Sequence, residues 1–260
     1  MLRALLSLLG VYKIYEKWLW HQVKNKSLPG HIAIILDGNR RWATKSGLKP
    51  WMGHFYGARK VEEVLKWCLD LGVKTITLYA LSTENFQRPR EEVEKLIELF
   101  KEKLRELLVS EEIRRYGVRV KVIGRIYLLP QDLQEIIYKI EEETKDFSEC
   151  YLNLAIAYGG RAEIIDTVRK VAQKVAKGEL SPEEISESIF EQHLYTSFLP
   201  KQDPDLIIRT SGEERLSGFL LYQSAYSELC FLDVYWPEFR RIDLLRAIRT
   251  YQKRVRRFGK

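Results

Sequence analysis

The sequence is poor in cysteine and lacks the short motifs that mark several common enzyme classes. Its three cysteines, Cys68, Cys150 and Cys230, lie far apart and form no CxxC pair. A disulfide framework or a zinc site is therefore not expected, and a reducing cytosol fits best. There is also no GxxxxGK[ST], GxGxxG, HExxH or GxSxG string. Kinase, dehydrogenase, zinc protease and serine hydrolase activities have no support.

Long hydrophobic runs are missing too. The apolar run at 1–9 is shorter than the roughly 20 residues that span a bilayer, and no small-residue cleavage site follows it. Instead, residues 1–27 place apolar and aromatic side chains at helical spacing among lysines, which predicts an amphipathic helix. This helix would lie either on a membrane surface or against protein. Leu28-Pro29-Gly30 ends it.

The composition favours one folded domain with a positive surface. The chain has 260 residues, 45% of them hydrophobic, which is enough for a single large core. Lys and Arg number 43 against 36 Asp and Glu, a net charge of +7. Such a balance attracts phosphorylated metabolites, nucleic acid or an acidic membrane without choosing among them.

The order of the apolar runs predicts an α/β fold. Runs that are apolar on both faces alternate with helical patterns, which indicates a single domain with a central, mostly parallel six-stranded sheet flanked by helices. We expect an N-terminal helix and linker at 1–29 and one folded domain at 30–260. The expected strands are His31–Leu36, Thr75–Leu81, Val118–Ile123, Tyr151–Ala157, Leu206–Arg209 and Glu228–Val234. The expected helices are 54–70, 91–109, 131–146, 161–177, 182–190 and 242–255.

A polar cluster follows the first strand, at the sheet edge where α/β folds bind ligands. A Gly-Asn turn exposes backbone N–H groups, and two arginines add forked donors that suit phosphate. One carboxylate beside a phosphate favours a bridging Mg²⁺. The alternative is an Asx-type turn with solvated arginines. The candidate residues are Asp37, Gly38, Asn39, Arg40, Arg41 and Trp42.

Two further clusters follow the second and fifth strands. Each has a plain alternative, a capped turn in one case and an exposed charged loop in the other. Glu228 is a candidate second metal-linked carboxylate or, equally, a surface strand residue. The remaining candidates are Ser82, Thr83, Glu84, Asn85, Phe86 and Arg88 after the second strand, and Arg209, Arg215, Leu216 and Ser217 after the fifth.

Taken together, these strings resemble the cis-prenyltransferase family, which includes undecaprenyl diphosphate synthase and the dehydrodolichyl diphosphate synthases. The resemblance extends from about His31 to Gly259. The matching strings, in order, are Asp37–Trp42, Gly53-His54, Leu78–Pro89, Asn153–Arg161, Ile208–Ser217, Ala225–Glu228, Trp236-Pro237 and Arg257-Phe258-Gly259.

The resemblance implies an activity and a set of roles. The enzyme would add isopentenyl diphosphate units to an allylic diphosphate, farnesyl or geranylgeranyl, and give a long-chain polyprenyl diphosphate. Asp37 and Glu228 would hold Mg²⁺. Gly38–Arg41 and His54 would bind the allylic diphosphate, the second cluster would line the reacting centre, and the third would bind isopentenyl diphosphate.

The resemblance leaves several details open. Family descriptions assign proton removal to the position of Asn85, but a carboxamide is a very poor base. We therefore expect Asn85 to orient the proton while a phosphate oxygen accepts it. Pro50 stands where the family usually has arginine, with Lys49 as a neighbouring point charge. The apolar stripe of the helix at 91–109 is typical of ordinary core, and only the resemblance suggests a product tunnel.

The resemblance also bears on assembly and location. The tail Arg257-Phe258-Gly259 resembles one that reaches a neighbouring subunit's site, which implies a homodimer. We expect a cytoplasmic enzyme, with peripheral contact at the inner membrane surface as an option. The competing hypotheses are a non-catalytic partner subunit of a prenyltransferase complex and a nucleic-acid-binding protein. The second is disfavoured because the arginines cluster beside single carboxylates at strand ends.

Overall fold

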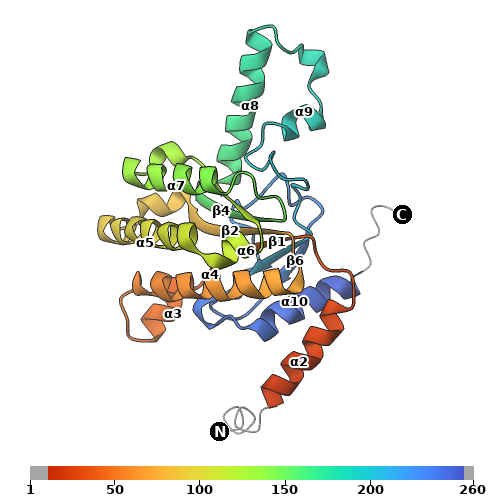
Figure 1. The fold of residues 1–260 in the computed structure, drawn as a ribbon. Helices are drawn as coiled ribbons and strands as arrows, with labels where there is room; N and C mark the ends of the chain where they lie inside the picture. The colour runs from red at the N-terminus through yellow and green to blue at the C-terminus, as the bar shows by residue number, and fades with distance from the viewer. Residues whose placement is uncertain (1–10, 255–260) are drawn as a thin grey trace.

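The protein is built on a six-stranded sheet whose strands all run parallel (Figure 1). The computed structural model describes residues 11–254. The strand order is β3-β4-β2-β1-β5-β6, which confirms the predicted sheet. The strands are β1 (His31–Ile35), β2 (Thr75–Ser82), β3 (Val118–Ile123), β4 (Cys150–Tyr158), β5 (Leu206–Arg209) and β6 (Glu228–Phe231).

The helices follow the predicted ranges closely, with two exceptions. The range 182–190 contains a short 3₁₀ turn, Pro182–Glu184, and a separate helix from Glu187, because Ser181 and Ser186 each cap a new turn. Two short helices, α3 and α6, were not expected as elements. The α-helices are α2 (Val11–Lys24), α3 (Asn39–Lys45), α4 (Met52–Leu71), α5 (Arg90–Val109), α6 (Glu111–Arg115), α7 (Gln131–Glu143), α8 (Gly160–Ala176), α9 (Glu187–Glu191) and α10 (Arg241–Lys253).

The two faces of the sheet are covered differently. On one face, strand residues such as Ile34 and Leu78 pack with buried side chains from α4, α5, α7 and α10 in the main core. On the other face, Ala33 and Ile207 pack with Phe219 and Leu220, which belong to the chain between α9 and β6. Helices α8 and α9 project from the body above this side (Figure 1). Non-helical chain thus covers part of the second face, where we expected helices.

The strand register brings two of the predicted clusters together. Ile35, the last residue of β1, pairs with Arg209, the last residue of β5. The segments that follow these strands therefore leave the sheet side by side, at its carboxyl edge. Asp37 and Thr210, 173 residues apart in sequence, are joined by a hydrogen bond from the Asp37 N–H to Thr210 Oγ1 at 3.1 Å.

Helix α2 forms the described part of the helix predicted at 1–27. Its Leu19 and Val23 are fully buried, and α2 lies beside α10 at the base of the molecule (Figure 1). Ile14 and Trp18, on another face of α2, are 69% and 48% exposed. Over residues 11–254, we find no helix with both the length and the apolar character needed to cross a bilayer.

Candidate active site

Asp37 stands at the centre of the candidate site, held between two arginines. Arg209 Nη2 donates to Asp37 Oδ2 at 2.8 Å, and Arg41 Nη2 reaches Oδ1 at 3.2 Å. The Gly38 N–H also donates to Oδ1, at 2.6 Å. Gly38 has φ of 100°, a left-handed conformation that glycine adopts without strain, so the chain turns sharply before α3.

The pKa of Asp37 reflects these contacts. Burial raises the pKa of Asp37. The hydrogen bond and the positive charge of Arg209 lower it, and the Ser211 hydrogen bond and the Arg41 charge lower it further. The net result is a pKa below the ordinary value for aspartate. Asp37 is therefore an ionised carboxylate at neutral pH, with an exposed fraction of 26% at its side chain.

Arg209 connects Asp37 to the third cluster. Its Nη1 donates to Ser217 Oγ at 2.8 Å and to the backbone carbonyl of Arg215. Its Nε is buried and has no hydrogen-bond partner in the described structure, so one donor of the guanidinium stays available. The Arg209 side chain is only 6% exposed, which fixes these directions. The geometry suits an anion placed beside Asp37.

The loop after β5 has an unusual backbone. Ser211 and Ser217 have φ of 81° and 50°, a region that non-glycine residues rarely adopt. Ser211 Oγ accepts from Arg41 Nη2 at 2.6 Å, and the loop is anchored where the Gly160 N–H donates to Gly218 O at 2.7 Å. Arg215, by contrast, is 65% exposed and pairs with Glu213 at 2.6 Å. Its guanidinium is therefore largely exposed, and its ion-pair partner is Glu213 rather than Asp37.

A second cationic group lies beside the first turn of α4. Glu92, on α5, has only 5% of its surface exposed and contacts three basic side chains. Its Oε1 lies 3.1 Å from Arg88 Nη1, 3.4 Å from Arg40 Nε and 3.7 Å from His54 Nε2. Burial lowers the pKa of His54, and the charges of Arg88 and Arg40 lower it further, against the effect of Glu92. His54 is therefore neutral at physiological pH.

Close helix packing explains why two glycines lie in the first turns of α4. A Cβ on Gly53 would lie 2.0 Å from the backbone oxygen of Asn39, and one on Gly57 would lie 2.3 Å from Asn39 Oδ1. Only glycine allows α4 to approach the turn after β1 so closely. This approach places His54 next to the first cluster.

The second cluster forms a short 3₁₀ turn, Thr83–Gln87, and Ser82 is its N-cap. Asn85 Oδ1 accepts a hydrogen bond from the Ser82 N–H at 3.1 Å, and the Ser82 side chain accepts from the Asn85 backbone. The oxygen of the Asn85 amide thus serves the backbone, which leaves Nδ2 to face a ligand as a donor. Thr83 lies against the glycine turn after β4, where a Cβ on Gly159 would come within 2.9 Å of Thr83 Oγ1.

The two remaining aromatic candidates are packed at the edges of the site. Phe86 contacts the main core, and the Trp42 ring lies 4.7 Å from that of Tyr56 on α4. Leu216 packs against the second core cluster, beside Phe219. Glu84, in contrast, forms no ion pair within residues 11–254 that would fix its carboxylate.

An elongated apolar cavity opens from this edge of the sheet and runs between α4 and α5. Its volume is about 540 Å³, and Asn39 and His54 lie at the end nearest Asp37. Leu96, Phe100 and Leu104 of the predicted apolar stripe line it, and Leu96 and Leu104 are also part of the core. The stripe therefore contributes both to the core and to the lining of this cavity.

Glu228 does not join Asp37 within one chain. It is the first residue of β6 and pairs in register with Leu206, the first residue of β5. The step from Ile32, beside Leu206, to Ile35 alone spans about 10 Å, so Glu228 lies at the opposite edge of the sheet. There it forms an ion pair with Arg254 at 2.5 Å. Within residues 11–254, no three His, Cys, Asp or Glu side chains form a metal-binding group.

Two contributors were missed at the sequence level. Thr210, fully buried, donates from Oγ1 to Asp37 O at 2.7 Å and so fixes the turn that carries the carboxylate. Glu92 contacts the three basic side chains of Arg40, His54 and Arg88. Its only sequence signal is a carboxylate in the first turn of a helix, where such residues are common for dipole reasons alone.

The comparisons with known proteins agree with this geometry. The family model described as "Putative undecaprenyl diphosphate synthase" matches residues 35–259. The chain therefore belongs to the undecaprenyl diphosphate synthase family, and it is a cis-prenyltransferase.

Similar proteins include the tritrans,polycis-undecaprenyl-diphosphate synthase (geranylgeranyl-diphosphate specific) of Methanocaldococcus jannaschii, 58% identical over 96% of this chain and 90% of that protein. The protein of the same name from Methanopyrus kandleri is 58% identical over 98% of this chain and 93% of that one. Among solved structures, lavandulyl diphosphate synthase from Lavandula x intermedia in complex with dimethylallyl diphosphate has a TM-score of 0.85. It is 37% identical and covers 90% of this chain and 99% of that one.

Proposed function

We propose that the protein condenses isopentenyl diphosphate repeatedly onto geranylgeranyl diphosphate to form a long-chain polyprenyl diphosphate. The observation that carries this proposal is the ionised Asp37, held between Arg41 and Arg209 at the mouth of an apolar cavity. Between the two starters left open by the sequence, the names of the relatives in Methanocaldococcus jannaschii and Methanopyrus kandleri favour geranylgeranyl over farnesyl diphosphate.

The two diphosphates are assigned to the two cationic groups. The allylic diphosphate would lie on the N–H groups at the start of α3, with His54 and Arg88 beside it. Since α3 has only seven residues, these N–H groups and side chains contribute more than a helix dipole does. Isopentenyl diphosphate would lie on Arg209 and Ser217, with Arg215 moving in from solvent. The hydrocarbon tail of the allylic substrate would enter the cavity.

The carboxylate of Asp37 fits a magnesium ion shared with substrate. Mg²⁺ commonly uses one or two carboxylates together with phosphate oxygens and water. Asp37 is ionised and partly exposed, and within residues 11–254 its Oδ2 accepts one hydrogen bond, from Arg209, although it has two lone pairs. We propose that Asp37 alone supplies the protein ligand within one chain. When bound, Mg²⁺ would stabilise negative charge on the departing diphosphate.

The residues themselves account for the remaining chemistry. The allylic carbon–oxygen bond breaks, its electron pair leaves with the diphosphate, and the isopentenyl double bond forms the new carbon–carbon bond. Preorganised donors from α3 and His54 stabilise the leaving charge without reorganising. Asn85 presents Nδ2, a donor, so it orients the substrate while a phosphate oxygen takes the proton that is lost. The leucine-lined cavity excludes water from the reactive carbon.

A starter comparison tests the proposal. Labelled isopentenyl diphosphate would be supplied with geranyl, farnesyl or geranylgeranyl diphosphate, and butanol-extractable lipid would be counted and sized by chromatography. We expect kcat/KM to be highest with geranylgeranyl diphosphate. Equal or higher values with farnesyl diphosphate would contradict the starter assignment, and no elongation with any starter would favour the non-catalytic partner subunit.

We also propose that the protein forms a homodimer through α8. Ile165 and Val168, on α8, are each 48% exposed, and Tyr127 is 67% exposed on the turn beside them. Arg125, two residues before Tyr127, donates to Asp166 of α8 at 2.9 Å, so this turn lies against α8. The tail Arg257–Gly259 lies outside the described residues. Sedimentation equilibrium should give a dimer mass for wild type and a monomer mass for Val168→Glu; a monomeric wild type would refute the proposal.

Helix α2 supports a further proposal, peripheral contact with an anionic membrane. Ile14 and Trp18 are exposed, and the Arg249 guanidinium lies 5.7 Å from the Trp18 ring. Apolar side chains ringed by positive charge suit an interface of acidic headgroups. Flotation should recover the protein with anionic vesicles but not with neutral ones, and Ile14→Asp should reduce recovery. Equal recovery with both vesicle types would refute this.

A further inference from the structure

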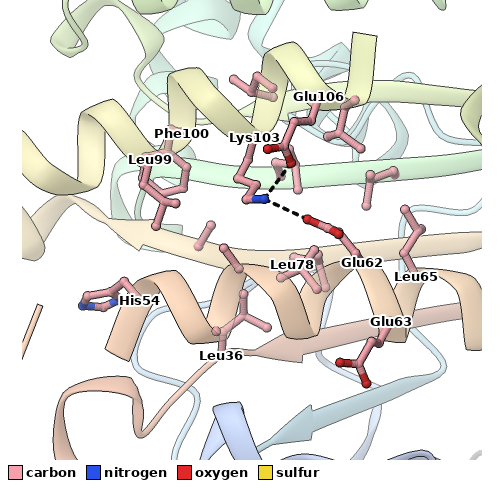
Figure 2. A pocket seen from close by; sticks show the side chains of 18 of the residues that line it. Leu36, His54, Glu62, Glu63, Leu65, Leu78, Leu99, Phe100, Lys103 and Glu106 are labelled. Atoms are coloured by element: carbon pink, nitrogen blue, oxygen red, sulfur yellow. Dashed lines mark hydrogen bonds and ion pairs between the residues drawn. The ribbon is translucent and has the colours of Figure 1, made fainter. Parts of the chain in front are cut away.

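An ionic bridge crosses the product cavity between its two long helices (Figure 2). Lys103 of α5 donates from Nζ to Glu62 Oε1 of α4 at 3.0 Å and to Glu106 Oε2 of its own helix at 2.6 Å. All three side chains line the cavity. We call these three residues the ionic strap.

The strap has a definite depth along the cavity. Helices α4 and α5 run in the same direction from the mouth, because His54 contacts Glu92 near their starts and Glu62 contacts Lys103 further along. Glu62 is eight residues beyond His54, and Lys103 is eleven beyond Glu92. At 1.5 Å per residue, the strap lies about 12–16 Å from the mouth.

The lining changes character at this depth. Before the strap, the side chains that line the cavity are apolar apart from Asn39 and His54 at the mouth. At the strap and beyond it, the helix side adds carboxylates and lysines, while the sheet side stays apolar through Leu152 and Leu154 of β4. A growing prenyl tail therefore follows the sheet and is kept from passing sideways between the helices. The apolar residues before the strap include Leu36, Ala58, Val61, Leu78, Ala80, Leu96, Leu99, Phe100 and Ile156.

We propose that the ionic strap determines product length by closing the gap between α4 and α5. This inference rests on the proposed elongation of an allylic diphosphate. With the strap in place, the tail must fit into the closed space along the sheet, and elongation ends when that space is full. Without the strap, the tail leaves between the helices, and more five-carbon units are added before release.

The strap is well suited to a test because its contribution to folding is small. The side chains of Lys103 and Glu62 are 25% and 56% exposed, and ion pairs of this kind add little to stability. Lys103→Met removes the charge but keeps the apolar stem. A matched control is Lys101→Met on the same helix, since Lys101 also pairs with two carboxylates, Glu98 and Asp132, at 2.7 and 2.6 Å. Lys101 does not line the cavity.

The measurement is the chain-length distribution of lipid made from geranylgeranyl diphosphate under equal turnover. We expect Lys103→Met and Glu62→Gln to lengthen the main product by one or more five-carbon units. Lys101→Met should leave it unchanged. Lys103→Glu alone should also lengthen the product, and adding Glu62→Lys should restore the wild-type length because the ion pair is reformed with reversed charges.

Two results would overturn the proposal. One is an unchanged product length in both Lys103→Met and Glu62→Gln, with melting temperatures showing that both are folded. The other is a double reversal that fails to restore the wild-type length, because the ionic contact would then not be the cause. Failure of the proposed function is distinguishable, since wild type itself would then elongate no starter.

Discussion

Replacing Glu92 with glutamine tests how the allylic diphosphate site is held together. The change keeps the shape of the side chain but removes the single negative charge among Arg40, His54 and Arg88. Glu92 is 5% exposed, so water cannot replace the lost charge. The guanidinium groups of Arg40 and Arg88 would then repel each other with no carboxylate between them, next to the neutral His54.

The magnitude follows from the separate contacts. The Arg40 side chain is 48% exposed, so its contact contributes at most about 1 kcal/mol. The 3.1 Å contact with Arg88 is charge-assisted and contributes about 1.5–3 kcal/mol. At 3.7 Å the contact with His54 is too long for a good hydrogen bond. We expect Glu92→Gln to lower the free energy of unfolding by about 2 kcal/mol. Loss of Arg88 placement should raise the Kd for geranylgeranyl diphosphate about tenfold.

Two assays with one control check this reasoning. Urea unfolding gives the stability change, and calorimetric titration with geranylgeranyl diphosphate gives the Kd. Glu94→Gln is the matched control, because Glu94 lies on the same helix and, within residues 11–254, forms an ion pair with the exposed Arg90 alone. It should change stability by less than about 0.5 kcal/mol. A Glu92→Gln protein as stable as wild type, with an equal or tighter Kd, would refute the positioning role.

Three further predictions concern single residues. Arg209→Lys should raise the KM for isopentenyl diphosphate at least about tenfold, because one ammonium cannot donate to both Asp37 and Ser217 as the guanidinium does. An unchanged KM would argue against a role of Arg209 in binding isopentenyl diphosphate. Asn85→Asp should lose activity at neutral pH, since a carboxylate repels diphosphate, whereas full activity with a new acidic limb in the pH–rate profile would indicate a general base instead. Burial lowers the pKa of His31 from 6.5 to about 4. As the pH falls, His31 therefore gains its proton in the unfolded chain before it does so in the folded protein. The free energy of unfolding should fall by about 2 kcal/mol from pH 7 to pH 5. A His31→Gln protein should show a flatter dependence in urea unfolding at the two pH values, and an equal slope would contradict the assignment.

The sequence was most informative where hydrophobic pattern and chain direction act together. Apolar runs identified all six strands, and in a parallel sheet their carboxyl ends share one edge. The sequence alone therefore places Asp37 and Arg209 at the same edge. Within one chain, the same rule separates Glu228 from Asp37. Glu228 begins a strand instead of following one, so it belongs to the opposite edge.

Other features depend on tertiary contacts that no local pattern encodes. The apolar stripe of α5 has the same period whether it meets a core or a cavity, and the structure uses it for both. Glu92 looks like an ordinary residue of a helix start until Arg40 and His54 approach it from other elements. The ionic strap likewise joins charges 41 residues apart.

The central claim is that Asp37 binds the magnesium ion that prenyl transfer at this site requires. The most direct test is incorporation of labelled isopentenyl diphosphate into extractable lipid by wild type and by Asp37→Ala, each with Mg²⁺ and with EDTA. We predict metal-dependent elongation by wild type and a loss of at least about 100-fold in Asp37→Ala, with the melting temperature retained. Elongation by Asp37→Ala within tenfold of wild type, or full activity in EDTA, would contradict the account.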